Sequence, residues 1–250
     1  MINLKTRLAA REPLLGTFLK TPHPHVVEVL ATSNFDLLCI DAEHAPLDRA
    51  ALDLCVMAAR AGNLPTLVRP ASASPDNILA ALDIGATGVI APHIRSADDA
   101  RALIRAAHYG PGGRGFAAST RAAGYGRATM EEHLARSERE TIVVAQIEDV
   151  EALDHVEAIA SVQRLDAVFI GRADLTVSFG CTSADDPRVV DAVERIVAIC
   201  VERQMPVGMF LARPADVPQW RDRGASLFLL GSDHGLMRSG ATALRQTAGM

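Results

Sequence analysis

Charged and titratable side chains come directly after a short apolar run near residue 40. The run Leu37 to Ile40 predicts a buried strand, and Asp41, Glu43 and His44 follow it. Polar groups at the end of a buried strand carry an unfavourable desolvation free energy, so a chain that keeps them there usually uses them. Because histidine titrates near neutral pH, His44 is a candidate general acid or base.

The same arrangement recurs at the ends of later apolar runs. Arg69 follows the run Thr66 to Val68, and a fixed cation there could stabilise negative charge on an enolate oxygen. Arg69 could also form a salt bridge with Asp41 or Glu43, and the two roles are compatible. Where several strands end in such groups, an active-site rim is the simplest explanation.

Two carboxylates could hold a divalent cation. Glu148 and Asp174 follow the apolar runs 142–145 and 167–170, which belong to the fifth and sixth predicted strands. Together they could bind one hard cation, Mg²⁺ or Mn²⁺ with Co²⁺ also possible, and leave positions for water and a chelating substrate. Acidic residues after strands also cap helices, and that use is the commoner one.

Three further residues are candidate substrate contacts. Gln146 lies two positions before Glu148 and therefore on the same face of the strand, where it could donate to a substrate oxygen. The turn at Gly171 and Ala173 could offer a backbone N–H to a carboxylate. His93 also lies near a predicted rim, but a lone rim histidine more often packs or hydrogen-bonds, so we assign it no catalytic role.

Alternating strands and helices must position these groups. Apolar runs predict eight strands, and helical patterns with i, i+3, i+4 spacing lie between them. Eight βα units in 250 residues fit one (β/α)8 barrel domain over residues 1–250, with catalytic groups at the C-terminal ends of the strands. An open doubly wound sheet would need a glycine-rich turn after the first strand, and Gly16 to Pro22 is not one. The predicted strands lie near residues 14–20, 36–41, 65–69, 88–93, 142–148, 166–171, 206–211 and 226–231, and the clearest helical patterns span 50–61, 97–107, 150–160 and 189–201.

Composition argues against several function classes. A formal net charge of −5 makes nucleic acid or an anionic membrane surface an improbable main partner. The sequence contains no apolar run long enough to span a bilayer and no secretory h-region, so we expect a cytoplasmic protein. The cysteines show no CxxC spacing, and Cys39, Cys55 and Cys200 sit in apolar patterns typical of reduced core residues. Residues 109–127, rich in glycine and arginine, form either an anion-binding flap or pocket wall, or a solvated surface loop.

The motifs around these residues resemble those of the HpcH/HpaI aldolases, over nearly the whole chain from Gly16 to the last helix. The D-x-E-H-A-P and G-x-A-D-L motifs in register carry the resemblance most strongly. It implies a class II aldolase that uses a divalent metal to join pyruvate or hydroxypyruvate to an aldehyde, like the 4-hydroxy-2-oxoheptanedioate and 2-dehydro-3-deoxyglucarate aldolases. It also implies a (β/α)8 barrel. The matching segments are Phe35–Pro46, Val68–Pro70, Leu82–Ala86, Arg114–Gly115, Gln146–Glu148 and Ile170–Leu175.

The resemblance also implies residue roles. In it, Glu148 and Asp174 are the metal ligands, and Asp83 forms a dyad with His44 and raises its basicity. Asp83 lies in an apolar helical stretch just before the fourth strand, which would place it toward the opposite end of the barrel from His44. The topology alone therefore does not predict the dyad.

The chain departs from the family pattern at two positions. Arg172 stands where many members have proline, and Phe18 stands where many have tryptophan. Phe18 keeps an aromatic wall. Arg172 places a cation beside the implied metal carboxylate, so the preferred substrate could differ from that of better-known relatives.

Residues 234–248 carry an apolar stripe on one predicted helix. Leu236, Met237, Ala241 and Leu244 lie on that stripe. The helix could close the eighth βα unit of its own barrel. The resemblance instead implies that it packs against a neighbouring subunit in a homohexamer.

Three other functions are alternatives. Decarboxylation of oxaloacetate would pass through the same kind of enolate. A sugar-phosphate isomerase or epimerase would need a phosphate cradle after the last two strands, where Leu211–Pro214 and Gly231–Asp233 offer one glycine and an acid that repels phosphate. A non-catalytic oligomeric barrel would not need acids, a histidine and an arginine at separate strand ends.

Overall fold

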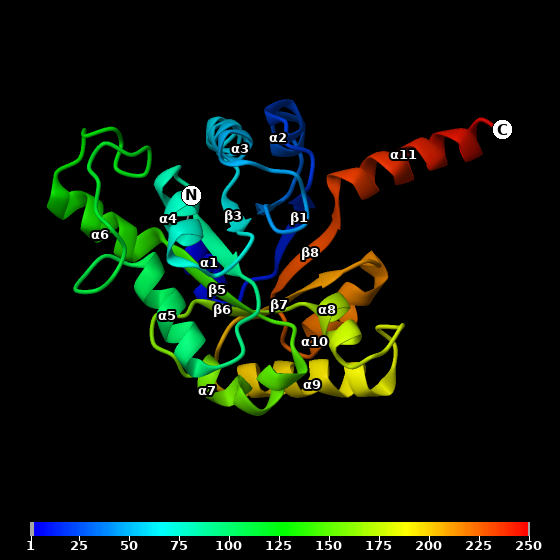
Figure 1. Ribbon diagram of the computed structural model, residues 1–250. Coiled ribbons are helices and arrows are strands. Elements are labelled where there is room, and N and C mark those ends of the chain that lie inside the picture. The colour runs from blue at the N-terminus through cyan, green and yellow to red at the C-terminus, as the bar shows by residue number, and fades with distance from the viewer. Residues whose placement is uncertain (1–2, 250) are drawn as a thin grey trace.

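Eight parallel strands form a closed barrel in the computed structural model, which describes residues 3–249 (Figure 1). Each strand pairs with the next in chain order, and the last pairs with the first through Leu14 opposite Leu227. The predicted (β/α)8 barrel is confirmed, and all eight predicted strands are present. The strands are β1 Leu14–Leu19, β2 Leu37–Asp41, β3 Thr66–Arg69, β4 Gly88–Ala91, β5 Ile142–Ile147, β6 Ala167–Ile170, β7 Val207–Leu211 and β8 Leu227–Ser232.

Helices surround the barrel, and local capping side chains fix where many of them start. Asp48, Ser74 and Ser96 each accept a hydrogen bond from the backbone N–H three residues later. Thr129 and Glu132 form a reciprocal capping box. The helices are α1 Leu4–Ala9, α2 Pro24–Ala31, α3 Arg49–Ala61, α4 Pro75–Asp83, α5 Ala97–Ala107, α6 Met130–Glu140, α7 Val156–Ala160, α8 Arg172–Ser178, α9 Pro187–Glu202, α10 Val217–Asp222 and α11 Asp233–Thr247.

One predicted helix is partly wrong. The pattern over 150–160 predicts a continuous helix, but Val150–His155 forms a 3₁₀ helix and only α7 is α-helical. Asp149 precedes this segment without capping it, because its carboxylate binds His93 and Arg95 instead. The apolar periodicity therefore predicts the buried face correctly, but it does not predict that the first half of the helix is 3₁₀.

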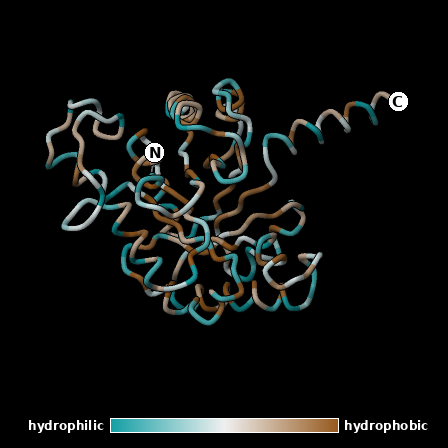
Figure 2. Tube along the Cα trace, viewed as in Figure 1, coloured by the Kyte–Doolittle hydropathy of each residue, from teal (hydrophilic) through white to brown (hydrophobic). Residues whose placement is uncertain are grey.

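The alternation of side chains along the strands divides the core into two clusters. Leu37 and Cys39 point into the barrel, whereas Leu38 and Ile40 pack against the surrounding helices. Figure 2 shows the corresponding hydrophobic traces at the centre and more hydrophilic helices outside. Cys39, Cys55 and Cys200 are buried and free, as predicted, and Cys181 is also buried. Within residues 3–249, no helix is long and apolar enough to cross a membrane.

Helix α11 extends away from the rest of the chain. In Figure 1 it runs from the end of β8 to the C-terminus without lying on the barrel. Its apolar stripe is uncovered, with Met237 56% and Leu244 74% exposed. The helix therefore does not close the eighth βα unit of its own barrel.

The segment between α5 and α6 packs against α3 and the end of α4 and does not reach the main cavity described below. Arg121 binds Asp53 near the middle of α3 at 2.5 Å, and Arg114 binds Asp83 at the end of α4 at 2.5 Å. Because the C-terminal ends of these helices lead into β3 and β4, the segment lies toward the N-terminal end of the barrel. In this chain it is not a wall of the main cavity.

Candidate active site

A cavity of about 740 Å³ lies at the C-terminal ends of the strands. This volume is in the range of sites for small molecules. Predicted catalytic and substrate residues gather on its wall, together with Phe18 and Lys20 from β1 and the residue after it. The predicted residues that line it are His44, Arg69, Gln146, Gly171, Ala173 and Asp174.

Arg69 is held rigidly at the floor of this cavity. Its Nε donates to Asp41 Oδ1 at 3.0 Å and its Nη2 to Asp41 Oδ2 at 2.9 Å. The ring of Phe18 lies against the guanidinium, with Cζ 4.6 Å from the ring centroid. Burial opposes ionisation of Asp41, but the hydrogen bonds and charge of Arg69, with help from Lys20, lower the pKa of Asp41 below its usual value. The predicted rim salt bridge is present.

Glu43 lies between two histidines and Arg69. Its Oε2 is 3.3 Å from Arg69 Nε and 3.6 Å from His44 Nε2, and its Oε1 is 3.7 Å from His93 Nε2. The Oε2 atom is buried and accepts no hydrogen bond. Burial, together with the charges of Asp41 and Asp174, raises the pKa of Glu43. The Glu43 carboxylate is thus buried with an oxygen that lacks a hydrogen bond, in a place where its ionised form is disfavoured.

Glu148 is buried directly after β5, and its carboxylate lies beside Gln146 and Gly171 of the cavity wall. Its Oε1 accepts from the backbone N–H of His93 at 2.9 Å, and its Oε2 contacts Gln146 Nε2. A Cβ at Gly171 would lie 2.6 Å from Glu148 Oε2, so only glycine leaves room for the carboxylate there. Burial, reinforced by the charge of Asp174, raises the pKa of Glu148.

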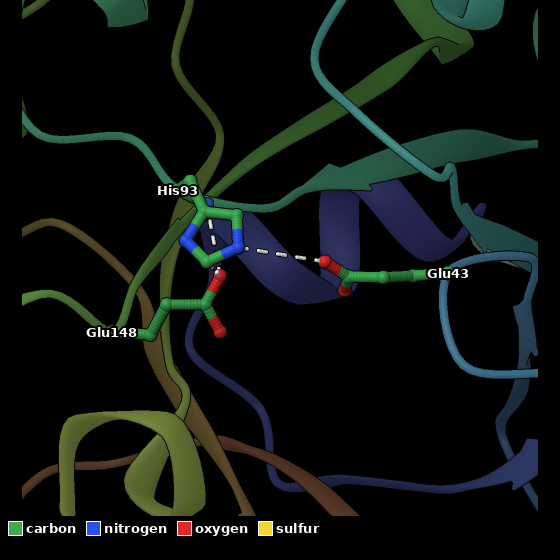
Figure 3. A group of neighbouring side chains, drawn as sticks. All are labelled: Glu43, His93 and Glu148. Carbon is green, nitrogen blue, oxygen red and sulfur yellow. Dashed lines mark hydrogen bonds and ion pairs between the residues drawn. The ribbon is translucent and has the colours of Figure 1, made fainter. Parts of the chain in front are cut away.

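The predicted pair of metal carboxylates lies close enough for mutual repulsion. Asp174 is in the first turn of α8 on the cavity wall, and its charge acts on both Glu43 and Glu148. Figure 3 shows Glu43, His93 and Glu148, whose ligand atoms lie within 4.8 Å of one another. Oxygen donors in excess of nearby cations, one of them without a hydrogen bond, fit a hard divalent ion.

His93 is a member of this cluster that sequence reasoning missed. Its backbone has the uncommon left-handed conformation, with φ of 56°, which directs its N–H at Glu148. Its ring Nδ1 is 3.0 Å from Asp149 Oδ2. Burial opposes protonation, but the bond to Asp149 and the charges of Glu148 and Glu43 raise the pKa of His93. His93 directly follows the strand β4, and titratable residues after buried strands mark the rim. That signal does not distinguish a functional histidine from one that only packs or hydrogen-bonds.

The structure does not bring His44 and Asp83 together within one chain. His44 is half-exposed at the cavity, beside Glu43. Asp83 ends α4 before β4 and is bound to Arg114 on the opposite side of the barrel. A dyad between these residues therefore does not form inside the single subunit, as the topology indicated.

Gln146 and Ala173 occupy the positions expected of them, with one difference. Ala173 lies in the first turn of α8, where backbone N–H groups have no partner inside the helix. Gln146 is fully buried and its amide nitrogen faces Glu148, while its Oε1 has no hydrogen-bond partner. Its amide is thus turned toward a carboxylate of the chain.

Comparisons with known proteins agree with this geometry. The model of the HpcH/HpaI aldolase/citrate lyase family matches residues 14–240. A 5-keto-4-deoxy-D-glucarate aldolase from Klebsiella pneumoniae is 33% identical over 242 residues, which cover 96% of this chain and 94% of that one. A pyruvate aldolase from Rhizobium etli is 33% identical over 244 residues, covering 97% and 95%. The crystal structure of an HpcH/HpaI aldolase/citrate lyase family protein from Burkholderia cenocepacia superposes with a TM-score of 0.92 at 33% identity and covers 98% of both chains.

Proposed function

The chain belongs to the HpcH/HpaI aldolase/citrate lyase family, and we propose that it joins pyruvate or hydroxypyruvate reversibly to an aldehyde with the help of a divalent cation. It is an aldolase and hence a carbon–carbon lyase. The observation that carries the proposal is the cluster of Glu43, His93 and Glu148 beside Arg69. The charge of Asp174, on the cavity wall, acts on both of its glutamates. Carboxylates that repel one another can bind a metal ion, and that ion together with the fixed Arg69 would stabilise the negative charge of an enolate.

Glu148 and Asp174 are the residues that would hold the cation. A bound Mg²⁺ or Mn²⁺, with Co²⁺ as a third candidate, would supply Lewis-acid stabilisation of the developing negative charge. The raised pKa of Glu148 and the unbonded Oε2 of Glu43 support this assignment, because both mark a shortage of positive charge. Gly171 supports it too, since any side chain there would displace the Glu148 carboxylate.

Arg69 and the start of α8 would bind the 2-oxo acid. The guanidinium, fixed by Asp41 and Phe18, would stabilise charge on the former carbonyl oxygen. The N–H of Ala173 would donate to the substrate carboxylate. Gln146 would orient Glu148, and its donation to a substrate oxygen requires that its contact with Glu148 open.

His44 would transfer the proton between the two halves of the reaction. In cleavage, His44 takes the hydroxyl proton from the carbon that becomes the aldehyde. The carbon–carbon bond then breaks, and its electron pair stays on the 2-oxo acid fragment as an enolate that is protonated on carbon. The place of His44 at the cavity edge, next to Glu43, supports this role.

The assembly would supply what the single chain lacks. Leu236, Met237 and Leu244 are exposed on a helix that leaves its own barrel, which suits contact with a second copy. Because Asp83 lies at the far end of its own barrel, only another subunit's Asp83 could reach His44. We therefore propose that α11 is exchanged between subunits, in the homohexamer that the family resemblance implies. Truncation after Ser232 should yield smaller or aggregated species, and light scattering of a stable monomer of the full 26.6 kDa chain would contradict the assembly.

A panel assay tests the proposed reaction. Pyruvate and hydroxypyruvate are offered with assorted aldehydes in the presence of Mg²⁺, Mn²⁺, Co²⁺ or EDTA, and oxaloacetate is offered alone. Product formation that depends on both the 2-oxo acid and the ion supports the aldolase. Turnover of oxaloacetate without any aldol product would favour the decarboxylase alternative. Isomerisation of a sugar phosphate in EDTA would contradict both.

A further inference from the structure

Arg172 is a cation on the wall of the main cavity that has no anionic partner. It begins α8, and its Nη2 donates to the backbone oxygen of Ala184 at 3.2 Å. Its Nε is buried and has no hydrogen-bond partner. Its Cζ lies 5.5 Å from the centroid of the Trp220 ring, which is itself buried. Within residues 3–249 the Arg172 guanidinium forms no ion pair, and its hydrogen bond goes to a backbone oxygen.

The acids nearest to Arg172 are already paired with another arginine. Asp216 Oδ2 is 2.9 Å from Arg213 Nε, and Asp185 Oδ1 is 3.4 Å from Arg213 Nη2. A partly buried charge without a counter-ion is unfavourable, so a ligand that brings one would be bound strongly.

The wall of the cavity carries charges of both signs. Asp174 lies on the wall next to the buried Glu148, where an anionic ligand group would be repelled. The same wall also includes apolar side chains of β7, β8 and α11, and the cations Arg172 and Arg238. The apolar walls include Phe210, Leu230 and Leu236. Such walls weaken solvent screening and strengthen a charge-assisted hydrogen bond.

We propose that Arg172 forms an anion subsite on this wall, which favours an aldehyde partner that carries a carboxylate. This inference rests on the proposed aldolase reaction, because it concerns the second substrate of the same cavity. The flat guanidinium can offer paired N–H donors to a carboxylate. Arg172 would then hold the charged end of the aldehyde, with Arg238 adding positive potential, and the aldehyde carbon would meet His44 in the same cavity.

The test compares charged and uncharged aldehydes of similar size. Glyoxylate is paired with glycolaldehyde, and succinic semialdehyde with butanal, each with pyruvate as donor. Arg172→Gln should lower the ratio of kcat/KM for the charged over the uncharged member by roughly 10- to 100-fold, the usual worth of a hydrogen bond to a charged group. Arg172→Met, which keeps the stem that packs on Trp220, should do the same, and Arg172→Lys should lose less.

Arg223 provides the matched control. Its guanidinium also lies over Trp220, at 5.3 Å, but it pairs with Glu194 and does not line the cavity. Arg223→Gln should leave the ratio within twofold of the unsubstituted protein. An unchanged ratio in Arg172→Gln and Arg172→Met, or an equal loss for charged and uncharged aldehydes, would overturn the subsite.

A donor-only measurement separates this inference from the proposed function. Exchange of the methyl protons of pyruvate with D₂O, followed by NMR, requires enolate formation but no aldehyde. If the unsubstituted protein with Mg²⁺ or Mn²⁺ shows no exchange, the proposed function fails. If exchange occurs and the ratio is insensitive to Arg172, only the subsite fails.

Discussion

The two ends of the barrel treat charge in opposite ways. At the N-terminal end, charged side chains are paired: Lys5 lies 3.1 Å from Asp166, Arg7 lies 2.7 Å from Asp36, and Arg114 binds Asp83. At the C-terminal end, Glu43, Glu148 and Asp174 face one another, and burial and repulsion raise the pKa of the two glutamates. The charges at the N-terminal end are paired, whereas the carboxylates at the C-terminal end repel one another.

That difference indicates where the barrel is built for stability and where for chemistry. An uncompensated charge lowers the stability of the empty protein, and it persists where a ligand will compensate it. Asp41 and Arg69 show the limit of this rule, because they are fully paired at the C-terminal end. Their pairing fixes a guanidinium and so serves the site.

The largest expected effect comes from removing one of the two carboxylates proposed to hold the metal. Glu148→Gln or Asp174→Asn should abolish aldol activity at any Mg²⁺ or Mn²⁺ concentration that saturates the unsubstituted protein. Thermal unfolding of the ion-free variants should occur at the same or a higher temperature, because one repelling charge is gone. Steady-state rates and melting curves check both parts, with Glu202→Gln, at the exposed end of α9, as the control. Full activity in excess EDTA would show that these carboxylates do not act through an ion.

The next effect concerns proton transfer at the same end. His44→Ala should lower kcat for carbon–carbon cleavage by roughly 10²–10⁴-fold, the usual worth of a positioned acid–base group. Binding of pyruvate should be retained, because Arg69 and the metal carboxylates are untouched. Stopped-assay kinetics and pyruvate titration measure the two quantities separately. A kcat within a few-fold of the unsubstituted value would remove His44 from the mechanism.

A smaller effect links the two ends across subunits. Asp83→Asn should lower kcat by less than about 10²-fold, because an orienting partner contributes less than the acid–base group itself. If Asp83 serves a neighbour's His44, mixed oligomers of His44→Ala and Asp83→Asn subunits contain some sites with both native residues. Their activity should exceed the average of the two parent oligomers. An activity equal to that average would leave Asp83 as a purely structural partner of Arg114.

Sequence alone sufficed for the barrel and for six of the residues that line the cavity. Each buried strand reads as an apolar run, and parallel topology brings the residues after those runs to one end, as it does for Arg69 and Glu148. His93 could not be separated in this way, since its role depends on a left-handed backbone and on the neighbouring Asp149. The apolar and polar pattern around residue 93 predicts neither the left-handed backbone nor the contact with Asp149.

Contacts between distant segments account for the other gaps. The partner of Asp83 is Arg114, which lies in a long irregular segment whose path no periodicity specifies. The stripe on α11 was readable from its spacing, but whether it packs on its own barrel depends on surfaces outside the helix. Likewise, the position of Arg172 was visible, while its missing counter-ion required knowing that Arg213 binds both nearby acids.

One buried group at the N-terminal end breaks the pattern of paired charges. His108 ends α5 with both ring nitrogens lacking a hydrogen-bond partner, and Glu138 Oε2 is 3.6 Å from its Nδ1. Burial, together with the positive charges of Arg164 and Lys5, lowers the pKa of His108 to about 4. The native protein therefore keeps this histidine neutral under conditions in which an unfolded chain would protonate it.

The smallest expected effect follows from that imbalance and concerns acid stability. An unfolded histidine titrates near 6.5, so between about pH 6.5 and pH 4 the unfolded state binds a proton that native His108 does not. Stability from this group is complete above that window and falls as the pH drops through it, by up to about 3 kcal/mol at its lower end. His108→Gln should therefore show a smaller loss of unfolding free energy between pH 7 and pH 5 than the unsubstituted protein, whatever its stability at pH 7. Urea unfolding at both pH values measures the difference, with His155→Gln at an exposed position as the control. If His108→Gln loses as much unfolding free energy between pH 7 and pH 5 as the unsubstituted protein does, the acid sensitivity of the barrel arises from other groups. His108 would then be no exception to the contrast between a stable N-terminal end and a reactive C-terminal end.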